Sequence, residues 1–276
     1  MHQRCLEVTD INNEIALVLI APLFFGISFI YSSVGFGGGS SYIAVLVLLG
    51  ISLFAVPPIA QILNIIVAGM AVISFAKAKH LSLKFTLPFL SSIPFAFFAG
   101  AITLPERNLA LIFVLALFAA SAALLLSGIR GRSFEKLQQE KRPKEIVVKL
   151  WDIRKILLIG VPTGAILGVV AGLVGIGGGI WLSPLLILSG MADPKRAAAT
   201  SSVFIVANSV SGFVGQSASK SIDLGILFPL ALVVLAGGLL GSRLGAFRLD
   251  HDKIRIIVSA IVAIAGLNLM IKFLFS

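Results

Sequence analysis

Long apolar runs, separated by short polar interruptions, extend along most of the chain. Eight of these runs are about twenty residues long. A helix of that length rises about 1.5 Å per residue and crosses roughly 30 Å of hydrocarbon. The runs are Ile15–Val34, Leu53–Ala76, Phe85–Leu104, Leu109–Ser127, Ile156–Val174, Ala197–Ser217, Leu224–Leu240 and Ile254–Phe275. The pattern predicts an all-α polytopic membrane protein.

Two glycine clusters interrupt this pattern at corresponding places. The first is VGFGGGSSY, Val34–Tyr42, and the second is VGIGGGIWL, Val174–Leu182. A shift of 140 positions keeps the G-x-G-G-G register, and Pro88 corresponds to Pro229 at a shift of 141. The two halves of the chain therefore look like a duplicated unit.

Each cluster is followed by a short apolar piece, Ser40–Gly50 and Ile180–Gly190. About eleven helical residues extend only roughly 16 Å, which is too short to cross a bilayer alone. If these pieces do not cross, each half has four spans and the repeats are parallel. If they do, each half has five spans and the second half is inverted. Gly- or Pro-interrupted segments at matching positions of inverted halves are a pointer to a transporter's binding site.

The distribution of Lys and Arg decides between the two arrangements, because cytoplasmic loops of membrane proteins are enriched in these residues. Four spans per half, with the N-terminus inside, place 15 of the 22 basic residues in the cytoplasm, and five spans per half, with the N-terminus outside, place 18 there. We therefore expect two inverted repeats of about five membrane segments each, with a short Gly-interrupted helix in each half.

The expected domain boundaries follow from this arrangement. Residues 1–14 form an extracytoplasmic tail, 15–128 the first membrane repeat, 129–154 a basic cytoplasmic linker, and 155–276 the second membrane repeat. Both termini are expected outside the cytoplasm, in a multi-pass protein of the plasma or inner membrane. The N-terminal tail contains more acid than base and no small-residue cleavage site, so it does not resemble a signal peptide.

Composition and charge exclude several other classes of protein. Apolar residues make up 58% of the chain and charged residues 12%, about half the charge content of a soluble domain. The net charge of +10 could indicate nucleic-acid binding, but surplus Lys and Arg in a membrane protein usually mark the cytoplasmic side. We expect contact with the lipid bilayer and no nucleic-acid partner. Cys5 is the only cysteine, which excludes an intramolecular disulfide and a cysteine-built metal site, and no cofactor is expected.

A candidate binding site follows from the helices that begin after each glycine cluster. Their first N–H groups are unpaired and carry the positive end of the helix dipole. Two such ends together would attract an anion, each by about 0.3–2 kcal/mol, without a charged side chain. Neutral polar residues nearby complete the candidate site. The expected residues are Gly37, Gly38, Gly39, Ser40, Gln61, Asn64, Gly177, Gly178, Gly179, Thr200, Ser201, Asn208 and Gln216.

Residues of these types also have purely structural roles in membrane helices. Glycines let the helices pack closely, and hydroxyls and amides form hydrogen bonds between them. Asn64 and Asn208 fall in comparable places, at a shift of 144 because the second half contains the additional segment DPKR.

Every carboxylate falls in a tail, in a loop or at the edge of a span. Proton-driven carriers usually contain a membrane-embedded Asp, Glu or His, and none is evident here, so we expect no charge inside the spans. The sequence also contains no constellation typical of hydrolysis, phosphate transfer or metal chemistry, so we do not expect an enzyme. Lys195 and Arg196, next to the second short piece, either attract anions at the cytoplasmic entrance or anchor the topology.

The two G-x-GGG elements, the segment GGGIWLSPLLILSG and the following AAATSSVFIVANSVSGF resemble the sulfite exporter TauE/SafE family. Its members are also called TSUP transporters, after 4-toluene sulfonate uptake permeases. The resemblance covers Ile15 to Phe275, and it implies transport of small sulfur-containing anions such as sulfite, thiosulfate or organosulfonates. The family's proline five residues after the last glycine is present as Pro184, whereas the first half has Ala44.

These observations predict a permease or exporter for a small, sulfur-containing anion that works by alternating access between inverted repeats. An alternative is a cation-coupled carrier that binds its ion through carbonyls at the broken helices. A less favoured alternative is a membrane-embedded enzyme or assembly factor, which would need polar catalytic groups at depth.

Overall fold

The computed structural model describes residues 20–141, 153–217, 224–249 and 251–275. These residues form helices joined by turns, with no β-strand among them, so the predicted all-α architecture is confirmed. Seven of the helical segments are long and apolar enough to cross a membrane. The expected N-terminal tail lies outside the described residues.

In chain order, the first described helix is Ile20–Ser33. It is followed by α2 (Gly39–Leu48), α3 (Val56–Lys77), α4 (Leu83–Thr86), η1 (Leu87–Ser91), α5 (Ser92–Ala101), α6 (Glu106–Lys141), α8 (Ile153–Val174), α9 (Gly179–Leu188), α10 (Pro194–Ser217), α11 (Leu224–Phe247) and α12 (His251–Phe275).

The apolar run expected at Phe85–Leu104 is not a single α-helix. A 3₁₀ segment, η1, joins α4 to α5 and contains Pro88. Proline lacks the N–H of an α-helical hydrogen bond and its ring clashes with the preceding turn, and short 3₁₀ pieces commonly accommodate such interruptions. The corresponding Pro229 lies inside the continuous helix α11.

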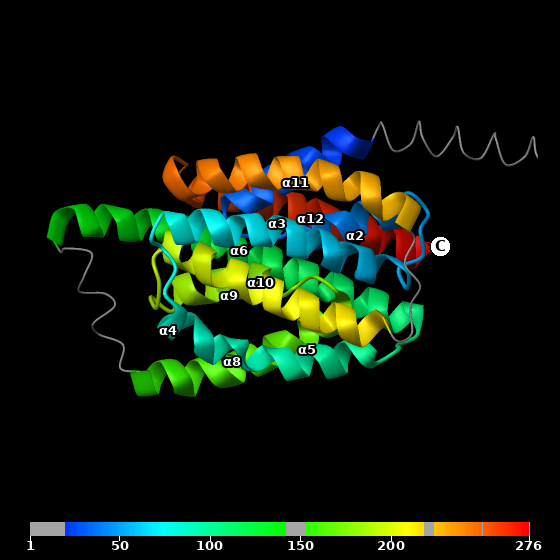
Figure 1. The fold of residues 1–276 in the computed structure, drawn as a ribbon, viewed down its shortest axis with the longest axis horizontal. Coiled ribbons are helices and arrows are strands. Elements are labelled where there is room, and N and C mark those ends of the chain that lie inside the picture. Colours follow the sequence, from blue (N-terminus) through cyan, green and yellow to red (C-terminus); the bar gives the residue numbers. More distant parts are fainter. Residues whose placement is uncertain (1–19, 142–152, 218–223, 250, 276) are drawn as a thin grey trace, which may run out of the picture.

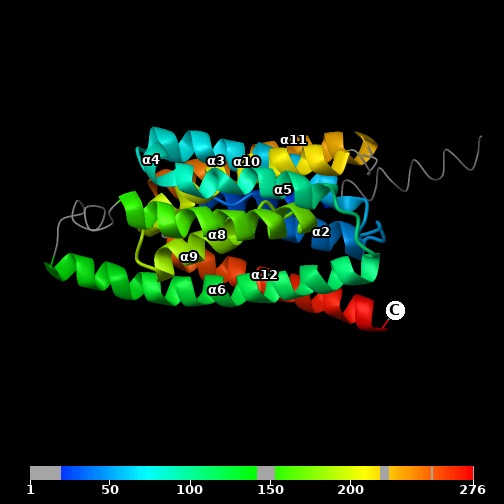
Figure 2. The ribbon, with the colours of Figure 1, turned by 90° about the horizontal axis from the view of Figure 1, so that it is seen from below.

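The helices form an elongated bundle with most axes along its long dimension (Figure 1). The helices α3 and α10 contact each other, and so do α6 and α12. Each of these pairs is antiparallel in both views, with α3 and α6 running from right to left in Figure 1 and α10 and α12 from left to right (Figures 1 and 2). Further contacts join α5 to α8 and α10, α11 to α3, α9 to α6 and α10, and α2 to α12 and α3.

Small residues bring two helix pairs into backbone contact. A Cβ atom on Gly172 of α8 would collide with the carbonyl of Ala96 in α5, and one on Gly241 of α11 would collide with the carbonyl of Phe29 in the first helix. Glycine at such interfaces lets membrane helices approach closely enough for van der Waals contact between backbones.

The helix α6 continues past the expected end of the first repeat, through residues 129–141 of the expected linker. Residues 142–152 lie outside the described part of the chain. The division at the linker therefore stays a prediction.

Replacing Gly241 by alanine should lower the thermal unfolding temperature, because the new methyl group must push α11 away from Phe29. Overpacking of this kind typically costs about 1–3 kcal/mol. The control is Gly69→Ala in α3, where a Cβ atom would meet no atom within 4 Å and alanine favours the helix by about 1 kcal/mol. Thermal unfolding of both purified variants in detergent checks this, and equal unfolding temperatures would contradict the close packing.

Candidate functional site

The helices α2 and α9 begin with the same backbone geometry. Their N-cap residues are Gly38, with φ 91° and ψ 1°, and Gly178, with φ 78° and ψ −15°. Both are left-handed conformations, which cost other L-residues about 1–2 kcal/mol. The register of the two glycine clusters therefore places a left-handed N-cap before each short helix, while the preceding residue differs, because Gly177 is also left-handed and Gly37 is not.

The side chain of Asn64 joins the two glycine clusters. The N–H of Gly39 donates a hydrogen bond to Asn64 Oδ1 at 2.8 Å, and Asn64 Nδ2 donates to the carbonyl of Ile176 at 3.2 Å. Asn64 is fully buried, and Cβ atoms on Gly37 or Gly39 would collide with its amide. One side chain of α3 thus connects the start of α2 to the backbone just before α9.

Polar groups without hydrogen-bond partners lie beside this connection. A Cβ atom on Gly177 would lie 2.8 Å from Ser209 Oγ and 3.4 Å from Asn64 Nδ2. Gln61 lies one turn before Asn64 in α3, and its Nε2 is 2.9 Å from the Cβ position of Gly212 in α10. Within the described chain, neither Ser209 Oγ nor either amide atom of Gln61 has a hydrogen-bond partner, although both residues are fully buried.

Gln61, Asn64, Gly177 and Ser209 form a group that we call the Asn64 cluster. A buried polar group without a partner costs about 1–3 kcal/mol, and such groups in native proteins often bind water, an ion or a ligand. The cluster offers amide and hydroxyl donors and neutral acceptors, with no ionisable side chain. It can therefore bind a small polar or anionic solute through hydrogen bonds.

The two short helices differ at their first turns. Gly39 is capped by Asn64, whereas a Cβ atom on Gly179 would meet the side chain of Ile205. The N–H groups of Gly179 and Ile180 form no hydrogen bond to any described residue. Ile205, not Asn208, thus occupies the place in the second half that Asn64 has in the first, so the two asparagines do not lie in comparable places. The short helix whose first N–H groups have no partner among the described residues is therefore α9.

Several of the expected site residues use a polar group elsewhere, although Asn208 Oδ1, Gln216 Oε1 and Ser201 Oγ are buried without a partner among the described residues. Asn208 Nδ2 donates to the carbonyl of Phe204 within α10 at 2.9 Å, and Gln216 Nε2 donates to the carbonyl of Gly172 in α8 at 2.9 Å. The hydroxyls of Thr200 and Thr86 lie 3.4 Å apart, and those of Ser40 and Tyr31 lie 3.3 Å apart. A Cβ atom on Gly178 would lie 2.8 Å from the ring of Phe204, and one on Gly179 would lie 2.9 Å from the carbonyl oxygen of Ser201. The structure therefore brings together Gly37, Gly39, Gln61, Asn64, Gly177 and Gly179.

The expected set omitted Ser209, which the structure places in the cluster. A signal was available in the segment SSVFIVANSVSGF, because Ser201, Ile205 and Ser209 follow one another at intervals of four residues. Residues at this interval share one face of a helix, and all three contact the second glycine cluster or lie beside it.

The expectation of no charge inside the spans is wrong at one position. Arg255, near the start of α12, is 0% exposed. Its Nη2 donates to Ser183 Oγ and to the carbonyl of Pro194, both at 3.0 Å. The guanidinium thus ties α12 to α9 and to the start of α10. Arg255 is the second residue of the expected span Ile254–Phe275, which indicated a position at the edge of the span, and the packing of α9 and α10 against α12 buries it.

The fold and this site define a multi-pass helical membrane protein in which two interrupted helices meet at buried polar groups, an arrangement typical of transporters. A sequence model of the family described as "Sulfite exporter TauE/SafE" matches residues 20–269. The chain belongs to this family of membrane transporters.

Similar proteins carry transporter names as well. The chain is 30% identical over 252 residues to the "Probable membrane transporter protein y4hK" of Sinorhizobium fredii, which covers 91% of this chain and 97% of that protein. It is 31% identical over 121 residues to the "Probable membrane transporter protein YunE" of Bacillus subtilis, covering 43% of each. No solved structure matches the chain. The family and these names confirm a transporter rather than an enzyme.

Replacing Asn64 by alanine should destabilise the protein, because it leaves the N–H of Gly39 and the carbonyl of Ile176 buried without partners. Each orphaned group costs about 1–3 kcal/mol, so the unfolding temperature should fall clearly below that of the parent. Asn268→Ala, at an exposed position of α12, is the matched control. An Asn64 variant as stable as this control would show that the connection contributes little.

Proposed function

We propose that the protein is a permease for a small sulfur-containing oxyanion, such as sulfite, thiosulfate or an organosulfonate, and that it binds this anion at the start of α9. The observation that carries the proposal is that the first N–H groups of α9 have no partner among the described residues and lie beside the buried, unpartnered groups of the Asn64 cluster. A helix N-terminus attracts anions through its free N–H groups and its dipole.

The chemistry of the cluster suits an oxyanion. Backbone N–H groups of Gly179 and Ile180, the hydroxyl of Ser209 and the amide of Gln61 can all donate to oxygen acceptors. The neutrality of the site also has a consequence for transport. Because the site contains no fixed cation that would retain the anion, the anion can be released again. The choice of a sulfur-containing anion among small oxyanions comes from the family's description.

Alternating access would depend on two inverted repeats, and matching contacts support such a division. The first helix, α2, α3, α4–α5 and α6 would correspond to α8, α9, α10, α11 and α12. The contacts α2–α12 and α9–α6 then correspond, as do α3–α11 and α10–α5. The proposed equivalents α3 and α10 run antiparallel (Figure 1), which is the relation expected of inverted rather than parallel copies.

The basic residues support one orientation in a cell membrane. The ends of α3, α6 and α11 and the starts of α4, α8, α10 and α12 lie at the same end of the bundle, on the left in Figure 1. Basic residues occur in or next to these helix ends: Lys77, Lys79, Lys84, Arg154, Lys195, Arg196, Arg243, Arg248, Lys253 and Arg255. By the positive-inside rule this end faces the cytoplasm, so we propose the opposite end as the external one.

Single cysteines in a Cys5→Ser background test this orientation. Cysteines at the exposed positions Lys77 and Arg248 should react with a membrane-impermeant maleimide only after permeabilisation, and one at Arg107 should react in intact cells. Labelling of the Arg248 position from outside would instead favour parallel repeats of four spans, because that arrangement places Arg248 outside.

Transport in proteoliposomes tests the substrate and the site together. The parent should move ³⁵S-labelled sulfite, thiosulfate or a sulfonate, and Ser209→Ala should slow this at least tenfold, because a hydrogen bond to a charged group contributes about 1.5–3 kcal/mol. Its unfolding temperature should not fall, since the hydroxyl has no partner to lose.

Ser202→Ala is the control for this measurement. Ser202 is also buried in α10, but its hydroxyl donates to the carbonyl of Ala199 in its own helix at 2.8 Å, so transport should be kept. Full transport by the Ser209 variant would contradict the site. Transport of a cation, with no labelled anion moved, would replace the proposal by the carbonyl-binding alternative.

A further inference from the structure

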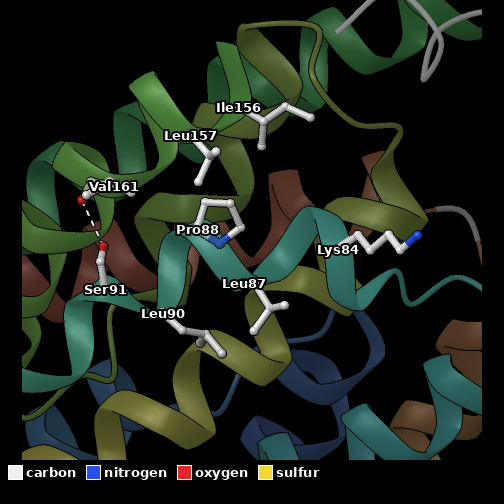
Figure 3. Close-up of a pocket in the computed structure, with 8 residues that line it drawn as sticks. All are labelled: Lys84, Leu87, Pro88, Leu90, Ser91, Ile156, Leu157 and Val161. Carbon is white, nitrogen blue, oxygen red and sulfur yellow. Dashed lines mark hydrogen bonds between the residues drawn. The ribbon is translucent and has the colours of Figure 1, made fainter. Parts of the chain in front are cut away.

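A groove of about 630 Å³ lies between η1 and α8, and none of its lining residues belongs to the Asn64 cluster (Figure 3). Six of its eight lining residues are apolar. They are Leu87, Pro88 and Leu90 on one side and Ile156, Leu157 and Val161 on the other; Lys84 and Ser91 complete the lining. Leu87 is 60% exposed and Leu157 is 46% exposed, so the groove opens outward between its two walls.

The two ends of the groove differ in chemistry. At one end the hydroxyl of Ser91 donates to the carbonyl of Val161 at 2.9 Å, and this hydrogen bond joins the walls (Figure 3). At the other end Lys84 extends its exposed ammonium group from α4. From Lys84 to Ser91 the chain rises about 10–14 Å at roughly 1.5–2.0 Å per residue, close to the ~15 Å depth of one leaflet.

Further cations lie near the Lys84 end. Arg196 is positioned over the ring of Phe85, 5.2 Å from its centroid, and the exposed Arg154 lies within one turn of Leu157 in α8. No carboxylate is among the residues that line the groove. The mouth of the groove is therefore positive, while its walls are apolar.

We propose that this groove binds one anionic phospholipid, with an acyl chain along the leucine-rich walls and the phosphate at Lys84. Basic pockets between membrane helices on the cytoplasmic side bind anionic headgroups, and long Lys side chains reach toward the interface from such positions. An apolar groove with the depth of one leaflet and a cation at its mouth matches both parts of a lipid. This proposal does not depend on the identity of the transported substrate or on the Asn64 cluster.

Lipid binding to the purified, delipidated full chain tests the proposal, with native mass spectrometry and the unfolding temperature as readouts. Phosphatidylglycerol should bind and raise the unfolding temperature more than phosphatidylcholine of the same acyl chains. Lys84→Gln should weaken phosphatidylglycerol binding about fivefold, because a juxtamembrane cation contributes on that scale. Lys77→Gln removes one charge at the same end of the bundle, outside the groove, and should keep full binding.

A second variant tests the apolar part. Leu157→Trp should fill the groove and reduce phosphatidylglycerol binding, while its exposed position allows the fold to be kept, as checked by a monodisperse elution profile. Glycerol 3-phosphate, which has the headgroup chemistry without acyl chains, should not raise the unfolding temperature. Equal binding of both phospholipids, unchanged binding by Lys84→Gln, or stabilisation by glycerol 3-phosphate alone would overturn the proposal.

Discussion

The amide of Asn64 satisfies two backbone groups that a membrane interior would otherwise leave without partners. Without water nearby, an unpaired N–H or carbonyl costs several kcal/mol, so a helix end within the bundle is stabilised where another group takes its hydrogen bonds. Asn64 does this for the N–H of Gly39 and for the carbonyl of Ile176. Gly37, Gly39 and Gly177 leave the space that the amide occupies, because a Cβ atom on any of them would lie against it. This accounts for the glycine clusters in a chain that is otherwise rich in large apolar residues.

The same framework is stabilised by different side chains in the two halves. After α2, the N–H of Leu53 donates to Glu106 Oε1 at 3.0 Å, from the start of α6. After α9, the carbonyl of Pro194 accepts from Arg255 at 3.0 Å, from the start of α12. Of the two backbone polar groups, a carboxylate can bind only the N–H, as an acceptor, and a guanidinium can bind only the carbonyl, as a donor. In each half, a charged side chain thus binds the backbone group that needs a partner: a carboxylate binds the N–H of Leu53, and a guanidinium binds the carbonyl of Pro194.

This asymmetry bears on the proposed mechanism. The cap on α2 takes up the N–H of Gly39, whereas at the start of α9 the N–H groups of both Gly179 and Ile180 have no partner among the described residues. The start of α2 is thus held by Asn64, and the start of α9 keeps the unpaired N–H groups that the proposed anion would bind. Around them, backbone contacts of Gly172 with Ala96 and of Gly241 with Phe29 hold two further helix pairs close together.

The apolar runs and the repeated glycines were sufficient to predict the membrane-spanning segments and the two glycine turns. Run length fixes which segments can cross a bilayer, and the left-handed turns at Gly38 and Gly178 are local features that glycine alone accommodates well. The membership of Gln61 and Asn64 in the candidate site was also predictable, because buried amides need partners. The partners themselves were not. Sequence spacing cannot tell which face of α10 meets the second glycine cluster, so only tertiary packing placed Ile205 and Ser209 there and turned Asn208 toward its own helix. It also buried Arg255, whose hydrogen-bond acceptors come from segments 61 and 72 residues away.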